Sequence, residues 1–190
     1  ENAMLFASEV KQRYKAETLQ NVLIQLTSDL DLEKVLDNIL VKLETVIPYD
    51  SACICLLQND QLTAVAGRGF KDPHKIIGQD YLIADDELFL DIQRTRRPVV
   101  IPDVSSDRRF KYYGGENNIR SWMGVPLIAR GVVIGCVTLD SDTPSTYREA
   151  EQASLAQAFA SHASIAVENA RLFTVEHEQR QTAEAFREIG

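Results

Sequence analysis

Apolar residues recur at every third or fourth position near the start of the chain, which predicts helices rather than strands. From Leu5 to Thr27 there is no proline or glycine, so we expect one long helix there. A second helix begins after Asp31, whose side chain can cap it, and ends before Pro48. Its apolar face is formed by Leu32, Val35, Leu36, Ile39, Leu40 and Leu43.

Shorter and denser apolar runs follow, and these are typical of buried strands. Two pairs of such runs are each joined by a short turn, so two hairpins are expected. The second turn is Arg130-Gly131, and neither of its flanking runs alternates cleanly with polar residues. This indicates a sheet that is covered on both faces. The four strands are predicted at residues 51–57, 62–66, 123–129 and 132–139.

The middle of the chain, residues 67–121, is rich in glycine and proline and predicts mainly loops. Within it we expect a short helix near Asp86–Thr95 and a strand at Val99–Ile101. After the second hairpin, Thr146 and Glu149 have the spacing of a capping box. A long alanine-rich helix should therefore run from directly after Thr146 to the penultimate residue.

Together these elements predict an α+β fold of the three-layer type. A central, mostly antiparallel sheet of about six strands carries the terminal helices on one face and the loop region with its short helix on the other. A chain of 190 residues with 45% apolar residues can bury the core that such a fold requires. Its 25% of charged residues is average for folded domains, which argues against disorder.

Charge and cysteine content exclude several classes of protein. Lys and Arg number 20 and Asp and Glu 28, and the formal net charge of −8 has the wrong sign for a general nucleic-acid binder. No apolar run is long enough for a membrane helix, and the first residues do not form a secretory signal. Three cysteines without a CxxC pair argue against a disulfide framework or a structural zinc site. We therefore expect a cytoplasmic protein that binds neither nucleic acid nor membrane.

The two ends of the chain resemble each other. Residues 1–17 and 168–184 agree at ten of seventeen positions, including the ordered string ENAxLF. Internal repetition of this kind favours one unit of a tandem array, joined to its neighbours by similar helices. The alternative is that helical linkers merely share a polar, alanine-rich composition. We expect a linker helix at residues 1–16, a domain at 17–173 and an outgoing helix at 174–190.

The second hairpin and the helix that follows it resemble the C-terminal half of a GAF domain. The family pattern is S-x-[LM]-x-V-P-[LI], then G-x-x-I-G-x-[LV]-x-L, then an alanine-rich helix ending in IAxENARL, and it matches residues 119–173. Residues 29–70 resemble the N-terminal half, and residues 98–110 match P-[VL]-x-I-x-D-x-x-x-D-x-R-F. The resemblance implies a sensory or regulatory module, of the kind found beside histidine kinases, cyclases, phosphodiesterases or transcription activators.

In this family ligands bind on the sheet under the loop region, which corresponds here to about residues 68–120. From Arg94 to Arg120 there are seven basic and three acidic residues, an excess that favours an anionic ligand such as a nucleotide or a carboxylate. The alternative is that the arginines pair with Asp103 and Asp107. Aromatic residues of this region either stack on a planar ligand or form a small core of their own. The expected ligand-binding residues are Cys53, Cys55, Leu88, Asp103, Arg109, Phe110, Tyr113 and Trp122.

Motifs of individual family members argue against their cofactors. Bilin-binding members attach the chromophore through a Cys-His pair, and residues 103–122 contain neither cysteine nor histidine. The N-K-x-F-D-E pattern of cyclic-nucleotide phosphodiesterases is absent from the sequence. Haem-binding members use an axial histidine, for which His74, His162 and His177 are poor candidates. We expect neither a covalent bilin nor haem.

Catalysis by cysteine is the strongest enzymatic alternative. Free methionine sulfoxide reductases have the GAF fold and use several cysteines in the loop region and the strand after it, whereas residues 68–135 contain none here. Cys53 and Cys55 alternate on one strand, and Cys136 lies in a core strand. All three are therefore expected to be small buried side chains, and the chain to be a binding module rather than an enzyme.

Heptad spacing on the C-terminal helix offers a route for a signal, because such a helix can form a weak two-stranded coiled coil and thus a parallel homodimer. The residues expected on this helix surface include Leu172, Val175, Gln179, Thr182 and Phe186. Two hypotheses follow. In one, a small molecule in the pocket biases the flanking helices toward an adjacent signalling domain; in the other, a ligand-free module serves as a dimerising spacer. Converging arginines around an open cavity favour the first, and a cleft filled by Leu88, Phe110 and Trp122 favours the second.

Overall fold

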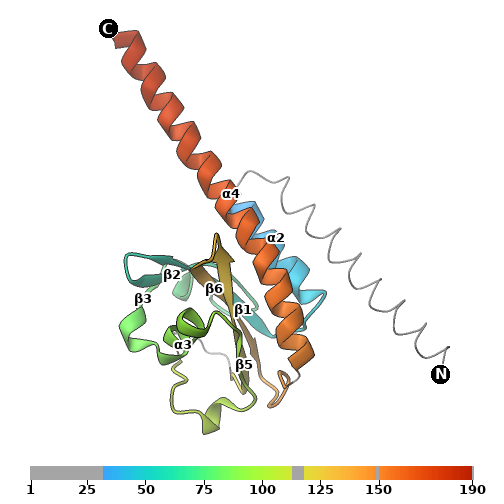
Figure 1. Cartoon of the computed structure of the whole chain (residues 1–190). Coiled ribbons are helices and arrows are strands. Elements are labelled where there is room, and N and C mark those ends of the chain that lie inside the picture. The colour runs from blue at the N-terminus through green and yellow to red at the C-terminus, as the bar shows by residue number, and fades with distance from the viewer. Residues whose placement is uncertain (1–31, 113–117, 149, 190) are drawn as a thin grey trace, which may run out of the picture.

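The computed structural model describes residues 32–112, 118–148 and 150–189. Six strands form its central layer: β1 (Ser51–Gln58), β2 (Gln61–Arg68), β3 (Asp80–Leu82), β4 (Val99–Ile101), β5 (Ser121–Ala129) and β6 (Val132–Ser141). They form one sheet in the order β3-β2-β1-β6-β5-β4, and every neighbouring pair is antiparallel (Figure 1). The middle positions belong to β1 and β6, the two most apolar strands of the two hairpins.

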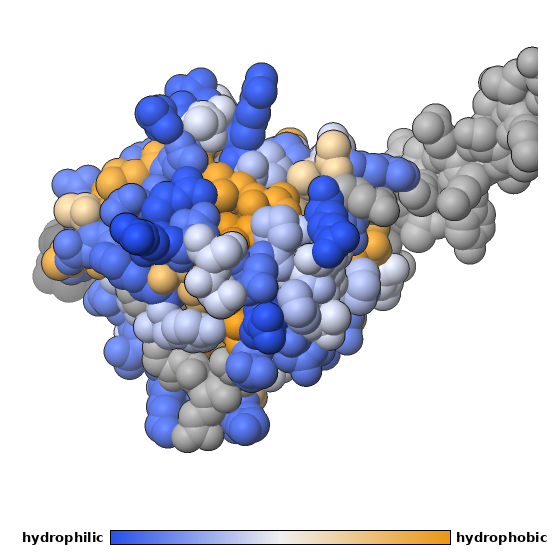
Figure 2. Space-filling model, turned by 90° about the horizontal axis from the view of Figure 1, so that it is seen from below, coloured by the Kyte–Doolittle hydropathy of each residue, from blue (hydrophilic) through white to orange (hydrophobic). Residues whose placement is uncertain are grey.

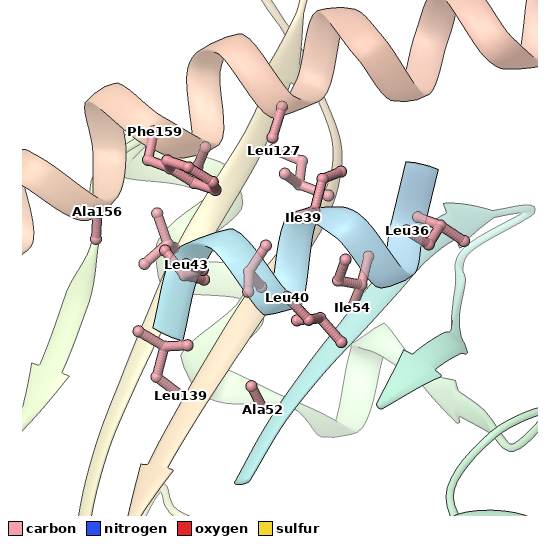
Figure 3. Packing of buried hydrophobic residues seen from close by; sticks show 14 of the residues in the cluster. Leu36, Ile39, Leu40, Leu43, Ala52, Ile54, Leu127, Leu139, Ala156 and Phe159 are labelled. Carbon is pink, nitrogen blue, oxygen red and sulfur yellow. The ribbon is translucent and has the colours of Figure 1, made fainter. Parts of the chain in front are cut away.

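Two helices cover one face of this sheet, and a third helix lies on the other face. α2 (Leu32–Glu44) and α4 (Ala150–Ile189) lie side by side on the first face (Figure 1), and α3 (Glu87–Thr95) lies on the second. Apolar side chains of both helices meet those of the sheet, as Leu43, Phe159 and Leu139 do in Figure 3. The predicted α+β fold of three layers is confirmed.

The elements predicted from apolar spacing are found within a few residues of their expected positions. The helix predicted at residues 5–27 and the cap at Asp31 lie outside the described residues. The edge strand β3 was not predicted. Only three of its residues pair with Gln61–Thr63 of β2, and an alternation of apolar and polar residues cannot be recognised over so short a run.

α4 begins later than predicted. Its first residue is Ala150, whereas Tyr147, predicted to be helical, is fully buried ahead of the helix. The Thr146 hydroxyl donates to the Thr143 carbonyl at 2.9 Å. The other half of the predicted capping box, Glu149, lies outside the described residues. Burial of the Tyr147 ring in the core thus decides where the loop ends and the helix starts.

The hairpin of β5 and β6 is the longest pairing in the sheet, and its predicted turn is confirmed. Arg130 and Gly131 have φ values of +50° and +78°, the left-handed conformation that a two-residue turn between twisted strands requires. Beyond the hairpin, α4 continues past the sheet as one helix to Ile189 (Figure 1). The boundary between domain and outgoing helix at residue 173 therefore lies within a continuous helix and stays a prediction.

Candidate functional site

The second face of the sheet is incompletely filled. A cavity of about 110 Å³ lies between the sheet and α3. Seen from below, the molecule shows apolar side chains between hydrophilic ones in the middle of its surface (Figure 2). The floor of the cavity comes from β1, β2, β5 and β6, and its walls come from β3, α3 and the loops. The lining residues are Cys53, Cys55, Leu62, Phe70, Ile76, Tyr81, Asp86, Leu88, Phe89, Ile92, Phe110, Lys111, Tyr112, Ile119, Trp122, Cys136, Thr138 and Asp140.

Strand register arranges the floor in rows across β1, β6 and β5. Since side chains alternate between the faces of a strand, every second residue of each strand points to the cavity side. One row begins with a buried polar pair and ends with an aromatic ring, and the next two rows carry the cysteines. The three rows are Ser51–Asp140–Trp122, Cys53–Thr138–Gly124 and Cys55–Cys136–Pro126.

The absence of a side chain at Gly124 makes room for Trp122. A Cβ atom placed on Gly124 would lie 2.3 Å from Cη2 of Trp122 and 2.6 Å from Cδ1 of Ile92. The indole ring therefore lies over the glycine and against α3. A single small residue in the floor thus positions the largest side chain of the site.

The aromatic residues of the loop region form a small cluster at one side of the cavity. The ring of Phe110 meets Tyr112 edge-on, with 5.1 Å between ring centroids, and Trp122, with 6.1 Å. Leu88 and Ile92 of α3 belong to the same region of the core. These rings thus pack on one another, one of the two alternatives that the sequence left open, and they leave the cavity open beside them.

Asp140 is a carboxylate at the floor of the cavity with only 5% of its surface exposed. The Ser51 hydroxyl donates to Oδ2 of Asp140 at 2.7 Å. Burial raises the pKa of Asp140 to about 7, although the Ser51 hydrogen bond opposes this effect. Around neutral pH this group therefore changes charge inside an apolar pocket.

Asp86 is a second carboxylate of the lining, and it caps the N-terminus of α3. Its Oδ1 accepts a hydrogen bond from the Phe89 backbone N–H at 2.9 Å. Burial raises the pKa of Asp86, while the backbone hydrogen bonds oppose this. Lys111 is the one basic residue among the described lining residues, and its Nζ donates to the Asp85 carbonyl. The lining thus carries two carboxylates and a single ammonium group.

The arginines of the loop region do not converge on the cavity. Arg109 donates to Asp107 at 2.7 Å and to Asp91 at 3.4 Å, and it is not part of the lining. Arg120 pairs with Asp103 at 3.3 Å. The hydrogen bond from the Arg109 guanidinium holds the pKa of Asp107 below its usual range. The pairing of arginines with neighbouring acids, the alternative to an anion site, is what the described residues show.

Five of the eight predicted contact residues line the cavity: Cys53, Cys55, Leu88, Phe110 and Trp122. Asp103 and Arg109 lie outside the lining because each is held in an ion pair of the loop region. Tyr113 lies outside the described residues.

Sequence reasoning missed the carboxylates Asp86 and Asp140. A signal for Asp140 existed, since it follows Cys136 and Thr138 at a spacing of two, directly after the strand predicted at residues 132–139, and so shares their face once the strand is extended.

The three cysteines are buried and unbridged, as predicted. Sγ of Cys53 lies 3.7 Å from Sγ of Cys55, and Cys136 is the register partner of Cys55. Hydrogen bonding to Cys55 and burial raise the pKa of the Cys53 and Cys136 thiols well above their usual range. Hydrogen bonds from Cys136 and Cys53 lower the pKa of Cys55. At most one of these thiols is therefore inclined to ionise.

Of the histidines considered as haem ligands, the described one does not line the cavity. His74 lies in a short 3₁₀ helix (Pro73–Lys75) outside the lining, and the side chains of His162 and His177 are outside the description. Among the described residues, no group of three or more His, Cys, Asp or Glu side chains is arranged to hold a metal ion. Within the same residues, no helix combines the length and apolar character needed to cross a membrane.

Comparison with known proteins identifies the fold. The family model described as GAF domain matches residues 29–168. The GAF domain of a phosphoenolpyruvate-protein phosphotransferase from Acinetobacter is 20% identical, with a TM-score of 0.71, covering 84% of this chain and 95% of that chain. The comparison with curated proteins gives no match.

Two further structural neighbours have different activities. Free methionine-R-sulfoxide reductase from Neisseria meningitidis, solved with its substrate, is 18% identical, with a TM-score of 0.69, covering 85% of this chain and 93% of that chain. A bacteriophytochrome from R. palustris is 11% identical, with a TM-score of 0.68, covering 90% of this chain and 40% of that chain. At these identities the likeness concerns the fold alone, and the function has to be argued from the site.

Proposed function

Because the chain belongs to the GAF domain family, we propose that it is a sensory module of a cytoplasmic signal-transduction protein. A small molecule binds in the cavity between the sheet and α3, and its presence is passed through α2 and α4 to an adjacent output domain, such as a histidine kinase or a cyclase. The observation that carries this proposal is the open cavity of about 110 Å³ with a buried carboxylate in its floor. A purely structural spacer has no need of either feature.

The strands provide a direct mechanical link between the cavity and the helices. On β5, Trp122 faces the cavity and Met123 belongs to the core beneath α2 and α4. On β6, Asp140 likewise faces the cavity, and its neighbour Leu139 belongs to the same core beneath the helices. A ligand that shifts Trp122 or Asp140 therefore acts on strands that directly support both helices. Such a shift changes the equilibrium between two arrangements of the helices only by as much as the ligand's affinity differs between them.

A second copy of the chain is the proposed partner of α4. Ile165 and Leu172 lie one heptad apart on α4, and 51% and 41% of their surfaces are exposed. Apolar residues at this spacing support a parallel two-helix contact that continues along the helix beyond the sheet. The side chains of Val175, Gln179, Thr182 and Phe186, predicted to extend this contact, lie outside the described ones.

Two other functions are weaker on the same observations. The packing of Phe110 on Trp122 favours a ligand-free spacer, but it leaves the cavity unfilled. The reductase of Neisseria meningitidis has the same fold, and a thiol enzyme would need a reactive, accessible cysteine. Here all three cysteines are buried in the floor, and Cys55, the one with a lowered pKa, is 7% exposed, so we propose binding without catalysis.

Native mass spectrometry of the full-length protein, purified from its own host and compared with its denatured mass, tests the proposal. A small molecule that is retained by the native protein and lost on denaturation supports a sensor and identifies its ligand. A dimer without any bound molecule contradicts the sensor and supports the spacer. A monomer without any bound molecule removes the basis for signalling through α4.

A further inference from the structure

We infer that the cavity selects a small organic cation, an ammonium group attached to an apolar body of about one ring. This inference rests on the proposed function, since it names the ligand class for the same pocket. It departs from the anionic ligand that the arginine-rich loop suggested. The reasons are the charges of the lining, the unpaired oxygen of Asp140, the aromatic walls and the size of the cavity.

The lining carries more negative than positive charge. The lining contains two acidic residues, Asp86 and Asp140, and one basic residue, Lys111, whose ammonium group is already bound to the Asp85 carbonyl. The nearby arginines are occupied outside the cavity, as the pairs of Arg109 with Asp107 and Asp91 show. A ligand with a carboxylate or phosphate would meet two acidic groups in an apolar setting, where like charges repel most strongly.

Asp140 provides the anchor for a donor group. Its Oδ2 is held by the Ser51 hydroxyl at 2.7 Å, whereas Oδ1 has no hydrogen-bond partner among the described residues. Asp140 is only 5% exposed, and it lines the cavity. Oδ1 is not among the buried side-chain oxygens that lack a partner, so it is accessible from the cavity, where an ammonium N–H supplies both a donor and the opposite charge.

The walls suit the remainder of such a ligand. Six aromatic residues line the cavity, and their ring faces attract cations as well as apolar groups. Of these, Trp122 neighbours Asp140 in the same floor row, so one ligand can contact both. A closed cavity of about 150 Å³ accommodates benzene. This cavity of about 110 Å³ is smaller but open to the surface, so it limits the apolar body to about one ring, part of which lies in the opening. The aromatic lining residues are Phe70, Tyr81, Phe89, Phe110, Tyr112 and Trp122.

Three probes of nearly equal size and different charge test this inference: benzylammonium, benzyl alcohol and benzoate. Trp122 is the single tryptophan of the 190-residue chain and lines the cavity, so its fluorescence reports binding directly. Titration calorimetry at pH 8 gives the same dissociation constants independently. Benzylammonium should bind at least about tenfold more tightly than benzyl alcohol, and benzoate should bind most weakly.

Matched variants locate the charge that matters. Asp140→Asn keeps the shape and the Ser51 hydrogen bond, and it should weaken benzylammonium about tenfold while leaving benzyl alcohol within about twofold. Asp86→Asn retains a good helix cap and provides a second test if the first variant folds poorly. Asp142→Asn is the control, because it removes one charge two residues farther along from Asp140 and outside the lining.

The outcomes separate this inference from the proposed function. If benzyl alcohol or benzoate binds as tightly as benzylammonium, the pocket binds small molecules but the inferred cation selectivity is wrong. Equal weakening of all three probes by Asp140→Asn also overturns the selectivity. If no probe binds while native mass spectrometry detects a retained anion or neutral molecule, the sensor stands and the ligand class is wrong. If no probe binds and no molecule is retained, both proposals are wrong.

Discussion

The two faces of the central sheet use the same strands and are packed in opposite ways. On β6, Val137 and Leu139 face α2 and α4, whereas Cys136, Thr138 and Asp140 face the cavity. The helix face is one continuous apolar core, while the second face holds two smaller cores beside an open cavity. Stability is therefore concentrated on one face and binding on the other, so that neighbouring residues on one strand should respond very differently to substitution.

The largest difference is expected between Leu139 and Thr138, which are adjacent on β6. Leu139 is fully buried in the helix-face core, and Leu139→Ala should lower the free energy of unfolding by about 2–5 kcal/mol. Thr138 is half-buried at the cavity, and Thr138→Ala should cost less than about 1 kcal/mol. Urea denaturation of both variants measures the contrast. Equal losses would show that the two faces contribute alike to stability.

A second prediction concerns the pH dependence that Asp140 gives to the cavity face. Burial raises the pKa of Asp140 to about 7, so the folded protein retains a proton that the unfolded chain loses near pH 4. Because the folded state then binds more protons, its stability falls as pH rises from about 4 to 7 and levels off above that. The nearby titratable groups Cys55 and Asp50 also raise the pKa of Asp140, by less than burial does.

The Asp140→Asn variant isolates this contribution. Relative to the variant, the wild type should lose about 2 kcal/mol of unfolding free energy between pH 5 and pH 7. Urea denaturation at pH 5, 6 and 7 gives the slopes, with the exposed turn residue Asp60→Asn as a control that should follow the wild type. Parallel slopes for wild type and Asp140→Asn would mean that Asp140 is ionised throughout this range.

Adding volume should have opposite effects on the two faces. Ala163 of α4 is fully buried in the helix-face core, and Ala163→Val should overpack it at a cost of about 1–2 kcal/mol. Cys53→Val adds a smaller volume toward the cavity and should stabilise the protein by about 0.5–1 kcal/mol. The same Cys53→Val change should weaken benzylammonium binding. Thermal unfolding and probe titration measure both effects, and a stabilising Ala163→Val would reveal unfilled space on the helix face.

The spacing of apolar residues was sufficient to predict the elements that form the helix face of the sheet, and insufficient to predict the lining of the cavity. The apolar positions of α2 recur at helical spacing, and those of β5 and β6 flank a turn whose residues require left-handed φ values, so local sequence determined these elements. The start of α4 was predicted too early, because Tyr147 is buried in the core ahead of the helix, a tertiary contact that local sequence does not give.

The candidate site shows the same limit. Its cysteines were placed on one face by counting in twos along β1, and the same count along β6 would have added Asp140. Arg109 was assigned to the ligand from regional charge, but the distance to Asp107 decides its role, and sequence does not give that distance. The side of the sheet on which a carboxylate lies can be read from a strand, whereas the partner of a surface arginine depends on loop geometry.

The smallest effect is expected at this arginine, and it separates the loop from the cavity. Arg109 is 39% exposed in its side chain and pairs with Asp107 at 2.7 Å, an arrangement that contributes about 0–1 kcal/mol at a surface. Arg109→Gln should therefore change stability little and leave the dissociation constants of benzylammonium and benzoate within about twofold. If the substitution instead weakened benzoate by tenfold or more, the guanidinium would have to reach the ligand, and the loop region would belong to the binding site. Unchanged constants would leave Asp86 and Asp140 as the charges that a ligand meets, and would confine binding to the floor and walls of the cavity.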